Sequence, residues 1–404
     1  VVVGVLAGLS VLVRENAMVW LVLLLVWVVL TCRKRGLRPG FAAMGGLVLG
    51  VSLVLLPVGV RNRVVGGEWS ISTFQAGPNF YIGNHSGADG RYQPLVRGHE
   101  TPAFERGDAT RLAELDRRRE LSAREVSRYW MSRAVSDIRA QPAWWLKLMA
   151  KKMLMVWNRY EVSDAESQYV YEDYSVTLRV LGSVWHFGVL CPLAAVGVLA
   201  TWPQRRRLWV YHALIVSMAL AVALFYVMAR YRYPLVPLLI LFAAAGCVEA
   251  WRGVRSGAWR TLAWQALAAA VVAVVVNWPV HDEKRLNAMA WMNVGVVLAE
   301  EDDLAGATKY FQRAVAGHPE SAEANNNLAQ AMALQGDYAG AIAHYQKALA
   351  VEPTLLGVDY NLAVALEQVG RLDEALTHYE RAVELDPSDA NARGAVRRLR
   401  ERER

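Results

Sequence analysis

Cysteine is scarce in this sequence, with three residues among 404. Cys32, Cys191 and Cys247 lie far apart, two of them within or at the end of apolar runs, and none has the spacing of metal ligands. We therefore expect structural thiols and no disulfide framework. The sequence indicates neither a cofactor nor a metal site, and it leaves a divalent metal open.

The chain also lacks an initiator methionine and the basic segment that begins a signal peptide. It opens on an apolar run, residues 1–13, that is typical of a membrane span already under way. We therefore expect an amino-terminal part of the protein to precede Val1.

Acidic residues are missing from three short basic loops, residues 32–38, 203–207 and 251–260. By the positive-inside rule these loops are cytoplasmic. Arg14, the long loop 61–175, the segment 230–233 and everything after residue 280 then lie outside. The apolar segments that these loops separate are residues 1–13, 17–31, 41–60, 176–201, 208–229, 234–248 and 262–280.

The composition divides the chain in two. It is 54% hydrophobic with a mean hydropathy of +0.18, too apolar for a soluble protein and too charged for a bare helical bundle. Residues 1–280 hold 31 Lys/Arg and 17 Asp/Glu, whereas residues 281–404 hold 13 and 20. Since much of the positive charge sits beside apolar segments, nucleic-acid binding is disfavoured and a membrane partner is favoured.

The long loop changes character along its length. Its first part, from Trp69 to Pro94, is rich in Gly, Asn, Pro and Ser and predicts turns and irregular backbone. Ser122 and Glu125 form a capping box for a helix over residues 123–139. Pro142 begins a Trp-rich helix with lysines on one face, which lies either in the lipid headgroup plane or against the membrane helices.

The stretch ARYRYPLVP, residues 229–237, separates two apolar segments. Pro234 and Pro237 restart the chain, because proline is tolerated in a first helical turn. Arg230 and Arg232 are at the membrane surface, where they either snorkel into headgroups or hold an anion. We refer to residues 229–237 as the hinge.

Three stretches resemble a known family: GPNFYIGNHSGADGRY, LSAREVSRYW followed by AQPAWWLKLMAKK, and RYRYPLVP. They are similar to the extracytoplasmic loop and late spans of polyprenyl-phosphate-dependent glycosyltransferases of the GT-C class, near the protein mannosyltransferases and aminoarabinose transferases of glycosyltransferase family 39. The resemblance covers about residues 1–280. It implies an all-α, polytopic helical bundle in a bacterial inner membrane, with its first spans missing here.

In that family a sugar leaves a polyprenyl-phosphate carrier at the outer face of the membrane. The catalytic carboxylate lies in a first outer loop that this sequence does not contain, so the catalytic residue is unknown. Cations must stabilise the leaving phosphate, and the candidates are Arg230, Arg232, Arg14 and Arg61. The candidates for sugar hydroxyls are Asn79, Tyr81, Asn84 and Asp89, with turn formation as the alternative role.

Residues 288–387 repeat with a period of 34. This pattern resembles the tetratricopeptide repeat and predicts an α-solenoid with a charged capping helix from Ala390. The recurring columns are Ala307, Ala341, Ala375; Phe311, Tyr345, Tyr379; Ala314, Ala348, Ala382; Gly295, Ala329, Ala363; and Pro319, Pro353, Pro387.

A polar column accompanies the apolar ones: Asn293, Asn327 and Asn361. In this repeat family the position lies on the concave face, where carboxamides can bond the backbone of an extended peptide, since each amide both donates and accepts. Solvated or helix-bonded asparagines are the alternative.

The sequence thus predicts four parts: membrane spans 1–60, an extracytoplasmic loop 61–175, further spans 176–280 and a repeat domain 281–404, the loop and repeats both being extracytoplasmic. The leading hypothesis is a multi-pass glycosyltransferase that uses a polyprenyl-phosphate donor, with repeats that bind a protein acceptor or partner. The alternatives are a non-catalytic scaffold for periplasmic assembly and a lipid-linked glycan ligase or polymerase.

Overall fold

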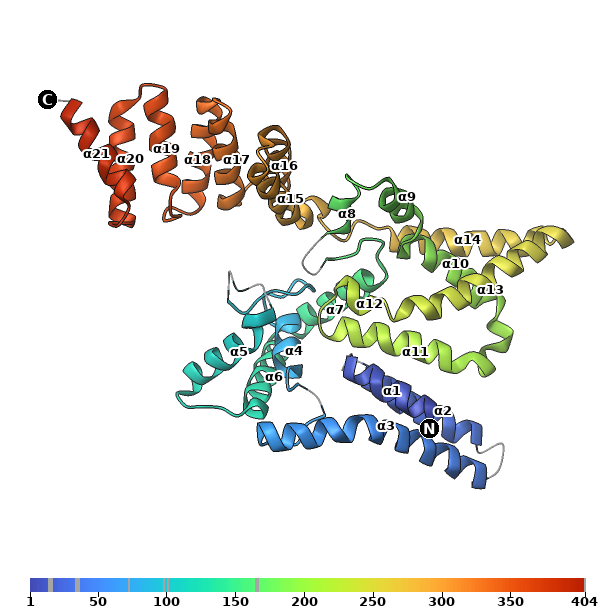
Figure 1. Cartoon of the computed structure of the whole chain (residues 1–404). Helices are drawn as coiled ribbons and strands as arrows, with labels where there is room; N and C mark the ends of the chain where they lie inside the picture. Colours follow the sequence, from blue (N-terminus) through green and yellow to red (C-terminus); the bar gives the residue numbers. More distant parts are fainter. Residues whose placement is uncertain are drawn as a thin grey trace. The chain divides into compact units, whose positions relative to one another are not determined.

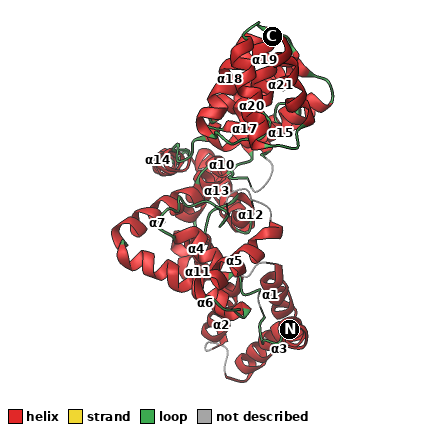
Figure 2. Ribbon diagram, turned by 90° about the vertical axis from the view of Figure 1, so that its left-hand side faces the viewer, coloured by secondary structure: helices red, strands yellow, loops and turns green. Residues whose placement is uncertain are grey.

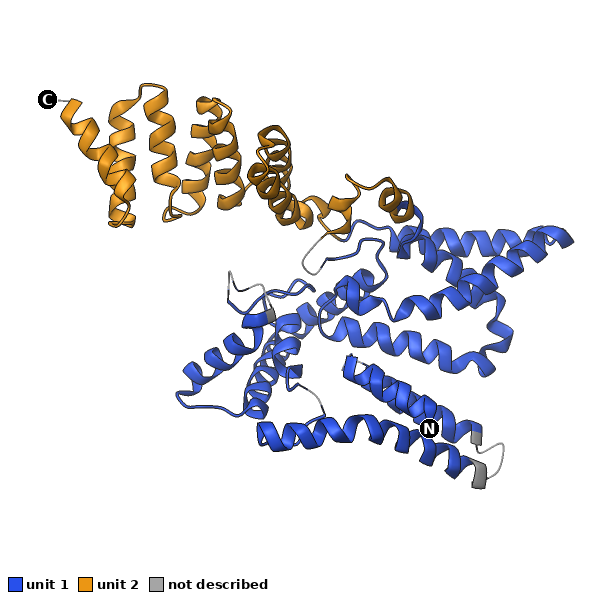
Figure 3. Ribbon diagram, in the orientation of Figure 1, with its two compact units in different colours: residues 1–164, 183–280 blue, residues 165–182, 281–404 orange. Residues whose placement is uncertain are grey.

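The computed structural model of the chain describes residues 1–13, 17–32, 37–71, 73–96, 99, 102–163 and 167–402. Over these residues the secondary structure is helical and contains no strand (Figure 2). The chain divides into two compact units, shown in Figure 3. Unit 1 comprises residues 1–164 and 183–280, and unit 2 comprises residues 165–182 and 281–404.

Unit 1 contains most of the apolar helices (Figure 1), whereas residues 176–182 belong to unit 2. Five described segments are long and apolar enough to cross a membrane by length and composition: Gly40–Gly66, Val176–Ala200, Trp202–Leu224, Leu235–Ser256 and Trp259–Val276. The helices concerned are α3 (Leu37–Gly66), α9 (Val176–Val184), α10 (Phe187–Ala200), α11 (Arg205–Leu224), α13 (Leu235–Ser256) and α14 (Trp259–Val276), with a 3-10 turn at Trp202–Gln204. Two shorter apolar helices, α1 (Val2–Val13) and α2 (Met18–Cys32), precede them.

One apolar core joins α10, α11, α13 and α14 to the end of α7 (Pro142–Trp157). Its buried members include Met155, Phe187, Met218, Leu235 and Phe242. The core extends to the hinge, where α12 (Ala229–Arg232) is a single helical turn. Pro234 then immediately precedes α13, as the prolines predicted.

The rest of the long loop is more helical than the sequence suggests. The prediction of irregular backbone up to Pro94 is wrong for α4 (Ala76–Asn84), and α5 (Pro102–Arg117) was not foreseen. In α4, Gly77 and Gly83 allow its backbone to contact the carbonyls of Ser127 and Phe225, so packing outweighs the low helix propensity of glycine. The predicted capping box is confirmed at the start of α6 (Ala123–Ala140), where Ser122 and Glu125 bond reciprocally.

At two places a helix and a predicted span end at different residues. The helix of the span expected to end at Val60 continues through Arg61, Asn62 and Arg63 to Gly66. The helix of the span expected to reach Ala229 ends at Leu224. In both places the hydropathy changes at one residue while the helical hydrogen bonds end at another, and helix ends follow the hydrogen bonds.

Unit 2 is a stack of antiparallel helix pairs (Figure 1). Its helices are α15 (Glu283–Glu300), α16 (Leu304–Gly317), α17 (Ala322–Leu334), α18 (Tyr338–Val351), α19 (Val358–Gln368), α20 (Leu372–Leu385) and α21 (Ala390–Arg402). The predicted columns are buried, as at Ala307, Ala341 and Ala375, each 0% exposed. Unit 2 also includes residues 165–182, with the short α8 (Gln168–Tyr171), which the sequence had assigned to the loop and the next span.

Candidate functional site

Three distant stretches of unit 1 meet at the side chain of Asn84, the last residue of α4. Its Nδ2 donates to the carbonyl oxygens of Phe80 and Leu224, both at 2.8 Å. Its Oδ1 accepts from Trp145 Nε1 at 2.9 Å and from Lys152 Nζ at 3.0 Å. The whole hydrogen-bonding capacity of the amide is therefore used to join α4, α7 and the end of α11. We call these groups the Asn84 cluster.

Lys152 is the charged member of this cluster and is 0% exposed. Besides Asn84, its Nζ donates to the carbonyl oxygen of Phe225 at 2.6 Å. Both described partners are neutral, so the ammonium has lost its water without gaining a carboxylate. Burial lowers the pKa of Lys152 to about 7. The side chain therefore holds or releases a proton near neutral pH inside a packed site.

This lysine predicts a pH-dependent stability. The pKa of Lys152 lies near 7 in the folded protein and near 10.5 when unfolded, so between these values the unfolded chain binds more protons. The free energy of unfolding should therefore rise with pH, by about 2 kcal/mol between pH 7 and pH 9. Thermal unfolding in detergent, followed by tryptophan fluorescence, should show this rise in the wild type and not in Lys152→Met. The exposed Lys151→Met is the control, and equal slopes in all three proteins would contradict the prediction.

Arg232 is also buried, although the sequence suggested a phosphate ligand. It is 0% exposed, and its Nη2 donates to Glu161 Oε1 at 2.8 Å. Its Nη1 donates to the carbonyl oxygens of Met155 and Tyr160, and its guanidinium lies 4.2 Å from the centre of the Phe187 ring. Burial raises the pKa of Glu161, and Arg232 opposes that shift. Arg232 thus forms a structural ion pair with Glu161 and, through its bond to the Met155 carbonyl, connects the hinge to the end of α7.

Arg230, on the other side of α12, is half-buried. Its guanidinium lies 5.1 Å from the centre of the Tyr231 ring, and its Nη2 donates to the Tyr231 hydroxyl at 3.3 Å. Tyr231 contacts Tyr226, which in turn contacts Tyr92, with ring centres 5.7 Å and 5.3 Å apart. An arginine beside an aromatic cluster at the hinge combines anion binding with a surface for a sugar ring.

Of the other two predicted phosphate ligands, Arg61 lies within the described residues and is not brought to the hinge. Arg61 is exposed on α3, bonds its neighbour Asn62, and is neither hydrogen-bonded nor ion-paired to the hinge within the described residues. Arg14 lies outside the described residues.

The four predicted sugar-binding residues also do not form one site. Asn84 is committed to the cluster, and Asn79 has a buried Oδ1 that accepts no hydrogen bond from the described chain. The ring of Tyr81 stacks on His85 with centres 5.2 Å apart. Burial raises the pKa of Asp89, but hydrogen bonds from Arg91 outweigh this and keep it below its usual range. Of the four side chains, only that of Asn84 joins the cluster.

Sequence reasoning missed a histidine–carboxylate pair in the loop. His99 Nδ1 lies 2.6 Å from Asp108 Oδ2, while Arg111 donates to the other oxygen at 2.9 Å. These hydrogen bonds hold the pKa of Asp108 below its usual range. Such a pair orients the imidazole ring. The sequence signal for this pair is the spacing of three between Asp108 and Arg111 on α5, which places the two side chains on one face of the helix.

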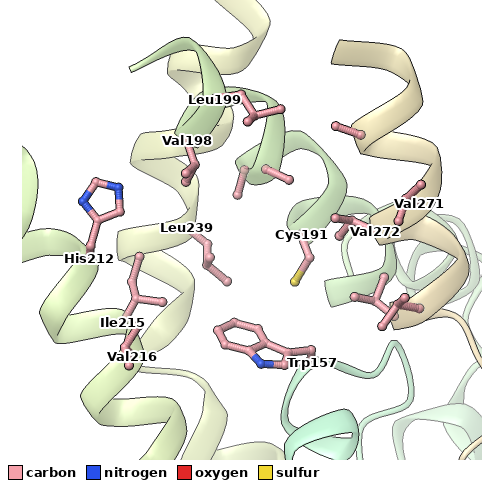
Figure 4. A pocket seen from close by; sticks show the side chains of 15 residues that line it. Trp157, Cys191, Val198, Leu199, His212, Ile215, Val216, Leu239, Val271 and Val272 are labelled. Carbon is pink, nitrogen blue, oxygen red and sulfur yellow. The ribbon is translucent and has the colours of Figure 1, made fainter. Parts of the chain in front are cut away.

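An apolar cavity of about 550 Å³ lies between α10, α11, α13, α14 and the end of α7 (Figure 4). Figure 4 shows Trp157, Cys191 and Leu239 facing into it, with His212 at one side. His212 Nδ1 lies 3.0 Å from the carbonyl oxygen of Leu208. The other lining residues are aliphatic, so the cavity offers a hydrocarbon chain a long apolar contact and almost no hydrogen bonds.

The asparagine column of unit 2 is accessible. Asn293 is exposed, and Asn327 and Asn361 are half-buried. Asn326 Nδ2 donates to Asn327 Oδ1 at 3.4 Å, which leaves the Asn327 amide nitrogen available to a ligand. Peptide binding through this column stays a prediction.

Comparison with known proteins identifies the repeats. Sequence models described as tetratricopeptide repeat match residues 303–353 and 332–399, so the carboxyl-terminal region consists of tetratricopeptide repeats. No curated protein matches the chain.

Similar solved structures are repeat domains. The first repeat domain of Spaghetti (RPAP3), bound to an HSP90 peptide, is 20% identical over 29% of this chain and 93% of its own, with a TM-score of 0.29. The second repeat domain of human RPAP3, in complex with an HSP70 peptide, is 19% identical over 29% of this chain and 98% of its own, with a TM-score of 0.28. The Arabidopsis OM64 repeat domain is 19% identical over 29% of this chain and 98% of its own, with a TM-score of 0.29.

Proposed function

We propose that the chain acts in a membrane glycosyltransferase of the GT-C class, which moves a sugar from a polyprenyl-phosphate donor to an acceptor outside the membrane. The observation that carries this proposal is the Asn84 cluster. The three stretches that resemble those enzymes contribute Asn84, then Trp145 and Lys152, and then the hinge, to one packed region. Arg232 of the hinge bonds the Met155 carbonyl in the same helix as Lys152.

Two further features support a lipid-linked donor. The cavity of Figure 4 presents aliphatic side chains to a hydrocarbon chain, and five helices have the length and apolarity of membrane spans. Arg230 is the phosphate ligand of choice, because it is half-buried beside the tyrosine rings, whereas Arg232 is 0% exposed. The sugar acceptor or a partner protein would bind the repeats, on the same side of the membrane as the hinge.

The donor site can be tested with polyprenyl phosphate and the matching polyprenol, titrated into the full chain in nanodiscs. We expect Arg230→Ala to weaken the binding of polyprenyl phosphate 10-fold or more, since a hydrogen bond to a charged group contributes about 1.5–3 kcal/mol. The affinity for the polyprenol should stay unchanged. Ala268→Phe, which fills the cavity, should weaken the binding of both ligands. Arg206→Ala, in a loop predicted to be cytoplasmic, is the control. Equal binding of phosphate and alcohol by the wild type would contradict the proposal.

A non-catalytic scaffold is the second candidate, favoured by the repeats themselves, because the family binds other proteins. It predicts partner binding without any polyprenyl-phosphate binding. The titration above separates the two candidates.

A further inference from the structure

The segment before α9 forms one wall of a groove in unit 2. A cavity of about 370 Å³ lies between residues 167–174 and α15. Its apolar lining includes Val170, Tyr171, Tyr174, Val294, Val297 and Leu298. Three of these are large and strongly exposed: Tyr171 at 42%, Tyr174 at 59% and Val297 at 52%. Exposed apolar side chains that gather in a groove are typical of an interaction site.

The wall is bonded to the first repeat. Ser167 Oγ donates to Asn287 Oδ1 at 2.6 Å. Asp173 accepts from the Tyr310 hydroxyl at 3.2 Å and pairs with Arg313. The Tyr174 and Tyr310 rings stack with their centres 6.0 Å apart. These contacts hold residues 167–174 against α15 and α16, so the groove is built jointly by the repeat and by residues outside it.

Acidic side chains gather at one end of the groove. Glu301 lines it, and Glu300, Asp302 and Asp303 adjoin Glu301 in sequence, all exposed. Two nearby cations are engaged within unit 2: Arg313 pairs with Asp173, and Arg179 donates to the carbonyl oxygens of Glu172 and Asp173. Unit 2 as a whole holds 23 acidic and 14 basic residues, a net charge of −9. An apolar groove with an acidic end favours a ligand that combines apolar and cationic side chains.

We propose that this groove binds a basic amphipathic segment of a partner protein, whose apolar face contacts Val297, Tyr171 and Tyr174 and whose lysine or arginine pairs with Glu301. The groove shares Asn293 with the asparagine column but is otherwise a different site, because four of its ten lining residues come from residues 167–174, outside the repeats. The inference rests on the proposed protein-binding role of unit 2 and is independent of sugar transfer.

The test uses the full chain in zwitterionic nanodiscs and a fluorescent 14-residue peptide with leucines at helical spacing and lysines elsewhere. A twin peptide carries glutamate in place of lysine. We expect the lysine peptide to bind more tightly than its twin, and a photo-cross-linker in it to label residues 170–174 and 290–301. Val297→Asp should weaken binding 10-fold or more. Glu301→Lys combined with Asp302→Lys should reverse the preference between the peptides.

The matched controls are Val351→Asp, at a similarly exposed valine, and Glu320→Lys, at an exposed acid in another turn. Both should bind like the wild type. Equal binding of the two peptides, or no effect of Val297→Asp, would overturn the proposal. Loss of binding only in Asn327→Ala with Asn361→Ala would move the ligand to the asparagine column. Dimers of the chain that dissociate on Val297→Asp would make the occupant a second copy and also overturn it.

Discussion

Replacing Arg232 with alanine should destabilise unit 1 by about 3–5 kcal/mol, because it removes the guanidinium that pairs with the buried Glu161 carboxylate. The variant also loses the bonds to the Met155 and Tyr160 carbonyls and the contact with Phe187. We expect a marked loss of folded protein, measured by fluorescence-detected size exclusion and by the thermal unfolding midpoint in detergent.

The matched comparison is the double variant Arg232→Met with Glu161→Leu, which removes both charges and keeps apolar volume. It should be more stable than Arg232→Ala, since well-packed apolar replacements of a buried ion pair are often tolerated. Arg230→Ala, on the same helical turn, should unfold close to the wild-type temperature. A fully stable Arg232→Ala that fails to bind polyprenyl phosphate would instead support the original expectation of a phosphate ligand.

Replacing Gly83 with alanine should destabilise the protein by about 3 kcal/mol or more. An added Cβ would lie 2.0 Å from the carbonyl oxygen of Phe225, a backbone atom that cannot rotate away. Moving α4 away from this carbonyl would stretch the bonds from Asn84 to Leu224 and from Lys152 to Asn84. The measurement is again thermal unfolding in detergent, together with limited proteolysis of the long loop.

Gly107 is the control for this substitution. It lies within α5, and an added Cβ would meet no atom within 4 Å. Gly107→Ala should therefore raise stability by about 0.5–1 kcal/mol through helix propensity alone. If Gly83→Ala proves as stable as the wild type, the close contact between α4 and Phe225 is not required for folding.

Some of the features behind these predictions can be predicted from the sequence, and others cannot. The capping box of α6 and the prolines before α13 were readable because each acts within a few residues of itself. Helix α4 was missed because its glycines and asparagines favour turns locally, whereas its stability comes from burial against α6 and the hinge. The loop helix with Trp144 and Trp145 was assigned correctly, but its buried Lys152 resembled any interfacial lysine.

By itself, the sequence determined the helical class, the apolar segments and the tetratricopeptide repeats, because each of these patterns recurs within about one helical pair. Only the tertiary structure decided the roles of Arg232, Lys152 and residues 167–174. Their partners lie far away in sequence: Glu161 for Arg232, Asn84 for Lys152 and Tyr310 for Asp173. No local pattern records such pairs, because they form only when distant helices pack and exclude water.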